Sequence, residues 1–190
     1  MSPTEKCIII SAPSGAGKTT IVHHLLSEGL GLAFSVSATS RTKRKHEVDG
    51  RDYFFLTAEV FRQRIAEGAF VEWEEVYEGQ FYGTLRSEID RIWGEGRSPV
   101  FDVDVEGGLN LKRFFGANAL ALFIAPPSLA ALEQRLRARG TETEESLQRR
   151  VKKAAHELTY AQRFDKVVVN DDLQLACKEA LDLVRTFLHP

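Results

Sequence analysis

The sequence predicts an α/β fold in which a mostly parallel β-sheet is flanked by helices. Short apolar runs that suit buried strands alternate along the chain with stretches of helical periodicity. The first apolar run, Cys7–Ser11, leads through a glycine-rich turn into a helix-like pattern from Gly17 to Ser27. A length of 190 residues, with 43% hydrophobic and 27% charged residues, suits one globular domain with inserted subregions.

The remaining core elements continue this alternation. We expect the first helix to end near Gly29 and Gly31, because glycine favours the backbone conformation that closes a helix. The further buried strands that we expect are Val100–Asp104, Ala119–Ile124 and Lys166–Val169. The helices expected between and after them are Val105–Phe115, Leu129–Arg139 and Leu173–Leu188.

Residues from about Phe34 to Arg86 break this rhythm and indicate a small α+β insertion. Alternating polarity and β-branched or aromatic content favour short strands around one helix. The expected elements are strands at Phe34–Ser37, Tyr53–Leu56 and Phe70–Trp73, a helix at Ala58–Glu67 and a turn at Gly79–Thr84.

A second irregular stretch, from Leu129 to Tyr160, is unusually rich in arginine. The run Gly140–Glu145 separates two helices within it, and Thr143 is a candidate N-cap for the second helix. A capping box is not expected, because Ser146 stands three residues on where glutamate or glutamine would be needed.

The turn after the first strand matches a phosphate-binding loop. Gly15 and Gly17 allow the backbone to point successive N–H groups inward, and the following helix adds its positive end. Lys18 is placed to reach the β- and γ-phosphates, and the hydroxyl of Thr19 is a ligand for Mg²⁺. Ala12 stands where the first glycine of the motif is usual. We therefore expect a bound nucleoside triphosphate.

A cluster of basic residues follows the first strand of the insertion. Arg41, Lys43, Arg44 and Lys45 occupy four of five successive positions and could grip a phosphate group. On charge alone, a solvated basic loop is the favoured explanation of this run, since most charge runs face solvent.

Composition excludes several classes of partner. A net charge of −2 provides no global field for nucleic acid or for an anionic membrane. Cys7 and Cys177 form neither a disulfide framework nor a metal-ligand spacing, and they indicate reduced thiols. Because no stretch approaches the roughly 20 apolar residues of a membrane span, a cytoplasmic location is the default expectation.

Taken together, these blocks resemble the guanylate kinase family nearly end to end. The segments that carry the resemblance are Ser11–Thr19, Phe34–Ser37 with Arg41 and Arg44, Tyr82–Thr84, Asp102–Asp104, Ile124–Ser128, Arg139–Ser146 and Val169–Asp172. The resemblance implies one domain over residues 1–190 with a P-loop NTPase-type core (1–33, 88–126 and 161–190). It also implies a GMP-binding insertion (34–87) and a helical lid (127–160).

The resemblance implies Mg²⁺-dependent transfer of the γ-phosphoryl group of ATP to GMP, in purine nucleotide metabolism. Its implied ATP-binding residues are Ser14, Gly15, Ala16, Gly17, Lys18, Thr19, Thr20, Arg135 and Asn170, the last on the adenine side. Its implied GMP-binding residues are Ser37, Arg41, Arg44, Tyr53, Glu72, Tyr82, Thr84 and Asp104. Its implied catalytic residues are Lys18, Arg44, Arg139 and Arg150. Thr19 would hold Mg²⁺, while Asp102 either joins the ion's ligands or only shapes the end of its strand.

Other functions stay open at this point. A kinase for AMP, TMP or another nucleoside monophosphate would share most of these motifs, and Glu72 is the residue that favours guanine. A related peptide-binding module without catalysis would usually have a degraded phosphate loop, whereas Lys18 and Thr19 are intact here. A GTPase lacks support because no second base-recognition motif is visible. No nucleic acid or membrane partner is expected, and a monomer is favoured.

Overall fold

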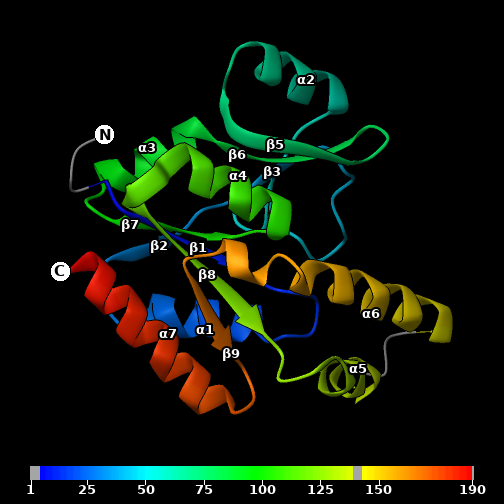
Figure 1. The fold of residues 1–190 in the computed structure, drawn as a ribbon. Helices are drawn as coiled ribbons and strands as arrows, with labels where there is room; N and C mark the ends of the chain where they lie inside the picture. The colour runs from blue at the N-terminus through cyan, green and yellow to red at the C-terminus, as the bar shows by residue number, and fades with distance from the viewer. Residues whose placement is uncertain (1–4, 139–142, 190) are drawn as a thin grey trace.

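A five-stranded parallel sheet forms the centre of the molecule (Figure 1). The computed structural model describes residues 5–138 and 143–189. The strand order is β2-β7-β1-β8-β9. The strands are β1 (Cys7–Ser11), β2 (Leu32–Phe34), β7 (Ser98–Asp102), β8 (Ala119–Ala125) and β9 (Lys166–Val169). The predicted α/β fold with a parallel core sheet is confirmed.

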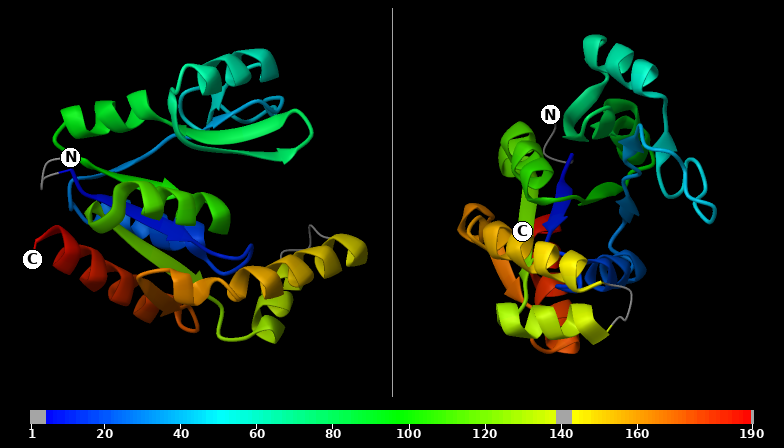
Figure 2. Two further views of the ribbon diagram at one scale, coloured as in Figure 1. Left: turned by 45° about the horizontal axis from the view of Figure 1, so that its top comes forward. Right: turned by 90° about the vertical axis from the view of Figure 1, so that its right-hand side faces the viewer.

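Both faces of this sheet are covered by helices (Figures 1 and 2). Ile8 and Ile10 point to one face, where they pack against α1 (Lys18–Ser27) and α7 (Leu173–Leu188). Cys7 and Ile9 point to the other face, which is covered by α3 and α4. Because β1 is buried on both faces, it carries an unbroken apolar run rather than an alternating pattern.

The helices α3 (Arg86–Gly94) and α4 (Val105–Phe115) lie between the central sheet and the insertion (Figure 1). The predicted helix at Val105–Phe115 is confirmed, and Asp104 caps it by accepting a hydrogen bond from the N–H of Gly107 at 2.8 Å. Two short 3₁₀ helices, Gly116–Asn118 and Ala161–Arg163, complete the core connections.

The insertion has its own sheet and its own small core. The sheet has the order β4-β3-β6-β5, with β3 (Ala38–Thr39), β4 (Phe54–Phe55), β5 (Phe70–Tyr77) and β6 (Gln80–Leu85). Helix α2 (Ala58–Ala66) packs Phe61 against Phe70 and Phe81, with stacked rings 4.3 and 5.3 Å apart. This aromatic cluster makes the insertion a separately packed layer above the core (Figure 1).

Helices α5 (Leu129–Ala138) and α6 (Glu144–Leu158) form a helical pair beside the core (Figure 2). They bury Leu132 and Leu136 against Leu147 and Ala154. The predicted N-cap at Thr143 is confirmed, because its side chain accepts a hydrogen bond from the N–H of Ser146.

Two local predictions in the insertion were wrong, and the helix that follows the insertion was not predicted. The strand expected at Phe34–Ser37 ends at Phe34, which belongs to the central sheet, where β2 pairs with β7. Most of the turn expected at Gly79–Thr84 is strand β6, because it pairs with β5 along a hairpin. Helix α3 was not foreseen, since its apolar side consists only of Ile89, Ile92 and the partly buried Trp93, and most of its other residues are charged or polar.

Within residues 5–138 and 143–189, none of the helices combines the length and apolar content that a membrane crossing needs.

Candidate active site

The phosphate loop runs from the end of β1 to the start of α1. Gly15 and Gly17 both adopt positive φ angles, of 95° and 97°, which a residue with a Cβ would adopt only under strain. Gly17 is the N-cap of α1, so the first N–H groups of the helix face the space above the loop. That space is a cavity of about 360 Å³. It is lined by Ala12, Pro13, Ser14, Gly15, Gly17, Lys18, Thr19, Thr20, Asp104, Lys153 and Glu157.

Asn170, at the end of β9, supports this loop from behind. Its Nδ2 donates to the carbonyl of Ala16 at 2.7 Å, and the residue is 4% exposed. A Cβ built on Gly17 would lie 2.2 Å from the same nitrogen. This side chain, which is expected near the adenine, thus contacts the phosphate loop from the end of β9, the strand next to β8.

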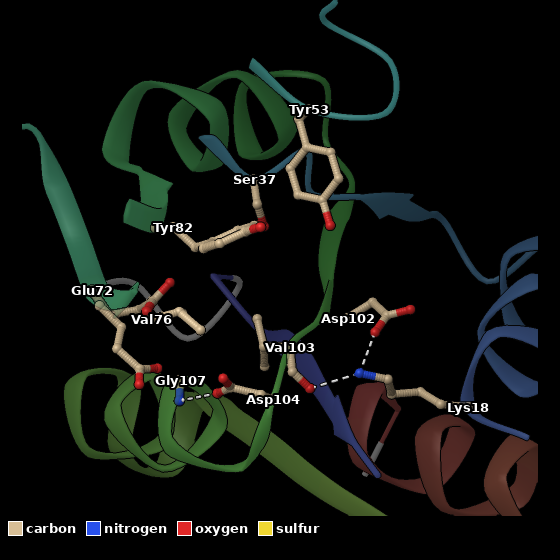
Figure 3. Close-up of a pocket in the computed structure, with 12 residues that line it drawn as sticks. Lys18, Ser37, Tyr53, Glu72, Val76, Tyr82, Asp102, Val103, Asp104 and Gly107 are labelled. Carbon is tan, nitrogen blue, oxygen red and sulfur yellow. Dashed lines mark hydrogen bonds and ion pairs between the residues drawn. The ribbon is translucent and has the colours of Figure 1, made fainter. Parts of the chain in front are cut away.

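Lys18 is held at the ends of two adjacent strands. Its Nζ lies 2.5 Å from Asp102 Oδ1 and donates to the carbonyl oxygen of Val103 at 2.8 Å (Figure 3). Register explains the pairing, because Ile10 of β1 lies beside Asp102 of β7. The ammonium group is thus fixed between the phosphate loop and the cavity described next.

A second cavity, of about 310 Å³, lies between the insertion and the core. Side chains from β5, β6 and the loop before β4 face the end of β7 across it (Figure 3). Its lining residues are Lys18, Ser37, Tyr53, Glu72, Glu74, Val76, Tyr82, Gly83, Asp102, Val103, Asp104 and Gly107. Lys18 and Asp104 line both cavities, so the two spaces adjoin.

Carboxyl groups gather at one end of this second cavity. Thr84 Oγ1 donates to Glu72 Oε1 at 2.6 Å, and Thr84 itself is 1% exposed. Burial raises the pKa of Glu72 to about 7, while the hydrogen bond from Thr84 opposes part of that rise. Burial and the nearby Asp104 also raise the pKa of Glu74. Thr84 is expected at the ligand, and its hydroxyl here orients Glu72.

The basic cluster is organised by an acidic residue that sequence reasoning missed. Glu47 accepts two hydrogen bonds from Arg41, at 2.6 and 2.7 Å, and a third from the backbone N–H of Arg44 at 2.8 Å. The Arg41 hydrogen bonds hold the pKa of Glu47 down at about 2. The Arg41 guanidinium also lies over the Tyr53 ring, 4.9 Å from its centroid. An acidic residue two positions after the basic run was the available signal.

The tyrosines of the insertion lie beside this cluster. The rings of Tyr53 and Tyr82 meet edge to face, 6.1 Å apart, and both line the cavity with Ser37 (Figure 3). Burial raises the pKa of Tyr53, so its hydroxyl remains a neutral donor at physiological pH. The side chain of Arg44 is exposed on the loop that follows.

The paired helices α5 and α6 contact the phosphate loop. Arg150 Nη1 donates to Ser14 Oγ at 2.9 Å, and a Cβ on Gly15 would lie 3.0 Å from Leu136 Cδ2. Arg135 Nη2 donates to the carbonyl of Asp171 at 3.3 Å, away from the loop. Arg139 lies outside the described residues.

Three other charged side chains of these helices form surface ion pairs or line the phosphate-loop cavity. Arg137 forms surface ion pairs with Glu133 and Glu144, as expected for an arginine outside the site. Lys153 and Glu157 line the phosphate-loop cavity and were not anticipated. Their spacing of one helical turn was the only signal, and such pairs occur on many exposed helices.

A phosphate loop at the end of a parallel sheet adjoins a second cavity, which is lined by two tyrosines and several half-buried carboxyl groups. This arrangement is typical of a P-loop kinase that binds a second small molecule. A family model described as guanylate kinase matches residues 4–186. The chain belongs to the guanylate kinase family.

Relatives with this name cover the chain almost completely. The guanylate kinase of Bacteroides fragilis is 49% identical, across 99% of this chain and 98% of its own length. That of Salinibacter ruber is 52% identical, with 98% of each chain covered.

Solved structures give the same result for the fold. The crystal structure of guanylate kinase from Anaplasma phagocytophilum superposes with a TM-score of 0.76 at 27% identity, over 100% of this chain and 89% of that one. A shikimate kinase from Bacteroides thetaiotaomicron, with a TM-score of 0.51 and 14% identity over 97% and 99% of the two chains, shares the fold alone.

Proposed function

We propose a residue-by-residue assignment for the reaction of this kinase family, in which the γ-phosphoryl group of ATP is transferred to GMP to give ADP and GDP. One observation carries the assignment: the phosphate-loop cavity and the insertion cavity adjoin, and Lys18 lines both. A phosphoryl group that passes between two bound nucleotides has to cross such a junction. A cation at that point stabilises the charge that develops on the transferred group.

ATP is assigned to the loop from Ser14 to Thr20. The backbone N–H groups at the start of α1 face this cavity and provide donors for the β- and γ-phosphates. Lys18 would exchange part of its pairing with Asp102 for the γ-phosphate when ATP binds. Asn170 contributes by holding the loop in shape rather than by touching the nucleotide.

GMP is assigned to the insertion cavity, with the guanine at the carboxyl end. An ionised Glu72 can accept hydrogen bonds from N1–H and the 2-amino group of guanine together, and Thr84 holds it in position. Adenine has an acceptor at N1 and lacks the 2-amino group, so the carboxylate would be left unpaired. Ser37 and Asp104 line the same cavity and complete the polar surroundings of the base.

The GMP phosphate is assigned to the basic cluster and the tyrosines. Arg41 is already oriented by Glu47 and by the Tyr53 ring, so little ordering is required when the phosphate binds. Tyr82 lies against Tyr53 and adds a second hydroxyl. Arg44 follows on the exposed side of the same loop, where it can close onto the phosphate. No general base is required, because the attacking phosphate oxygen of GMP is ionised.

The lid, residues 127–160, is assigned to the ATP phosphates. Arg150 already reaches the phosphate loop at Ser14, and Arg139 is assigned by family resemblance alone. Arg135 is a more distant candidate, because its guanidinium contacts Asp171. Closure of the lid and of the insertion, residues 34–87, would exclude water and limit hydrolysis of ATP.

The residues of the loop also suit Mg²⁺. The Thr19 hydroxyl is exposed in the phosphate-loop cavity, and Asp102 supplies a carboxylate on the far side of Lys18. Mg²⁺ is usually coordinated by one or two protein oxygens, together with substrate phosphate oxygens and water molecules. When bound, the ion neutralises phosphate charge. Because one chain carries every assigned residue, we propose that a monomer is sufficient for activity.

A coupled assay for ADP formation tests this proposal. With ATP and Mg²⁺ present, GMP, AMP, CMP, UMP and TMP are added in turn to the folded protein. ADP formation that depends on GMP alone is the expected result. Turnover with AMP or TMP would contradict the assignment of Glu72, and absence of turnover with every acceptor would favour a binding module.

A further inference from the structure

The chain crosses from the core to the insertion through a three-residue connector, and each residue is tied to a different part of the molecule. The N–H of Ser35 donates to the carbonyl of Val100 in the central sheet at 3.0 Å. The carbonyl of Ser37 accepts from the N–H of Phe54 in the insertion at 2.9 Å. Between them, the N–H of Val36 donates to a side chain rather than to another strand.

The acceptor is Glu88, in the first turn of α3. Its Oε1 lies 3.1 Å from the Val36 nitrogen, and its two oxygens also accept from Arg91 Nη2 and Nε, both at 2.9 Å. Glu88 is 3% exposed, whereas the Arg91 side chain is 49% exposed and also pairs with Glu95. A buried carboxylate is costly without donors, so these three hydrogen bonds explain how it is tolerated here.

The same helix begins where the chain returns from the insertion. Strand β6 ends at Leu85 and α3 starts at Arg86, whose N–H donates to the carbonyl of Ala69 at 2.9 Å. Glu88 therefore ties the outgoing connector to the returning helix. Both connections between core and insertion are joined at this one side chain.

We propose that Glu88 is a positioning residue for the acceptor nucleotide. It does not line the insertion cavity; it fixes Val36, and thereby places Ser37 opposite Asp104 on the core. The inference rests on the assignment of GMP to this cavity. It predicts that Glu88 controls affinity for GMP and leaves the phosphate loop undisturbed.

Three variants test the proposal: Glu88→Ala, Glu88→Gln and the control Glu95→Gln. Glu88→Ala removes the acceptor of the Val36 N–H and is expected to raise KM for GMP about tenfold, with KM for ATP within about twofold of wild type. Glu88→Gln should lie between Glu88→Ala and wild type, because its amide oxygen can still accept from Val36. Glu95→Gln breaks only exposed ion pairs, with Arg91 and Arg97, keeps Glu88 intact, and should match the wild type.

Two outcomes would overturn the inference. Lower thermal stability with both Michaelis constants unchanged would make Glu88 a purely structural residue. Equal increases in KM for both substrates would mean that the effect is not directed to the acceptor site.

If Glu88→Ala does not fold, amide hydrogen exchange at Val36 is measured in Glu88→Gln. Faster exchange with a raised KM for GMP supports the proposal, and faster exchange with an unchanged KM refutes it. Failure of the GMP assignment itself would appear separately, as wild-type protein without GMP-dependent ADP formation.

Discussion

The two cavities to which we assign the nucleotides are built in different ways. The phosphate loop consists of consecutive residues whose backbone N–H groups form the site, and its shape depends on Gly15 and Gly17. The insertion cavity is built from side chains that come from separate strands and from the core. A site built from backbone offers few side chains whose removal matters, whereas a site built from side chains depends on each of them. Mutations should therefore separate the two sites by substrate.

The largest effect is expected at Lys18, one of the two residues that line both cavities. Lys18→Ala should lower kcat by about a thousandfold or more, because the transferred phosphoryl group loses its positioned cation. Steady-state kinetics with circular dichroism as a folding control would measure this. Near-normal turnover by the folded variant would mean that Lys18 has no catalytic role.

A smaller but more selective effect is expected in the insertion. Glu72→Ala should lower kcat/KM for GMP by about a hundredfold or more and leave KM for ATP nearly unchanged, because the guanine loses a paired, buried acceptor. Glu75→Ala, an exposed position on the same strand, is the matched control. Equal losses for both substrates would mean that Glu72 only supports the fold.

The pKa of Glu72 adds a pH dependence to one site only. Guanine binds the ionised carboxylate, so raising the pH from 6 to 8 through its pKa of about 7 should lower KM for GMP by up to about tenfold. KM profiles for wild type and Glu72→Gln would show this, since the variant should have a flatter profile. The residual slope in the variant reports titration of the GMP phosphate. A wild-type profile as flat as that of the variant would mean that Glu72 is already ionised.

Raising the pH should strengthen GMP binding through Glu72, but it should lower the stability of the fold through the same group. Its folded pKa lies above the value of about 4.5 for an unfolded glutamate, so the unfolded chain ionises first as pH rises. The stability contribution of Glu72 is therefore complete below about pH 4.5 and is lost between about pH 4.5 and 7. At pH 8, Glu72→Gln should be more stable than wild type by on the order of 2 kcal/mol in urea unfolding. Lower stability of the variant would contradict the shifted pKa.

The smallest effect is expected behind the phosphate loop. Asn170→Ala removes one hydrogen bond to the Ala16 carbonyl and should raise KM for ATP about fivefold, with KM for GMP unchanged. Gln174→Ala, on the exposed start of α7, serves as the control. A change in selectivity among nucleoside triphosphates would instead indicate that Asn170 contacts the adenine base.

The core and the phosphate loop were predictable from sequence because their signals are local. Strand β1, strand β9 and helix α7 have the predicted bounds, and the loop motif lies between two of the predicted elements. Buried strands require continuous apolar runs, and a phosphate loop requires its glycines and lysine in fixed order. Each of these constraints is satisfied within a few neighbouring residues.

The insertion was less predictable because its strands are short and are stabilised by pairing with distant segments. Phe34 belongs to the central sheet only because β2 pairs with β7, more than sixty residues later in the chain. Glu47 and Glu88 each resemble ordinary surface glutamates in the sequence. Their burial depends on Arg41 in one case and on Val36 and Arg91 in the other.

The sequence by itself determined the α/β class, the phosphate loop and the residue types that a guanine nucleotide would need. The tertiary structure decided which partners those residues meet: it placed Glu72 in the cavity, made Thr84 its support and set Asn170 against the phosphate loop. Residue type limits what a side chain can bind. Which partner it meets depends on strand register and on packing between segments distant in the chain, which no local pattern records.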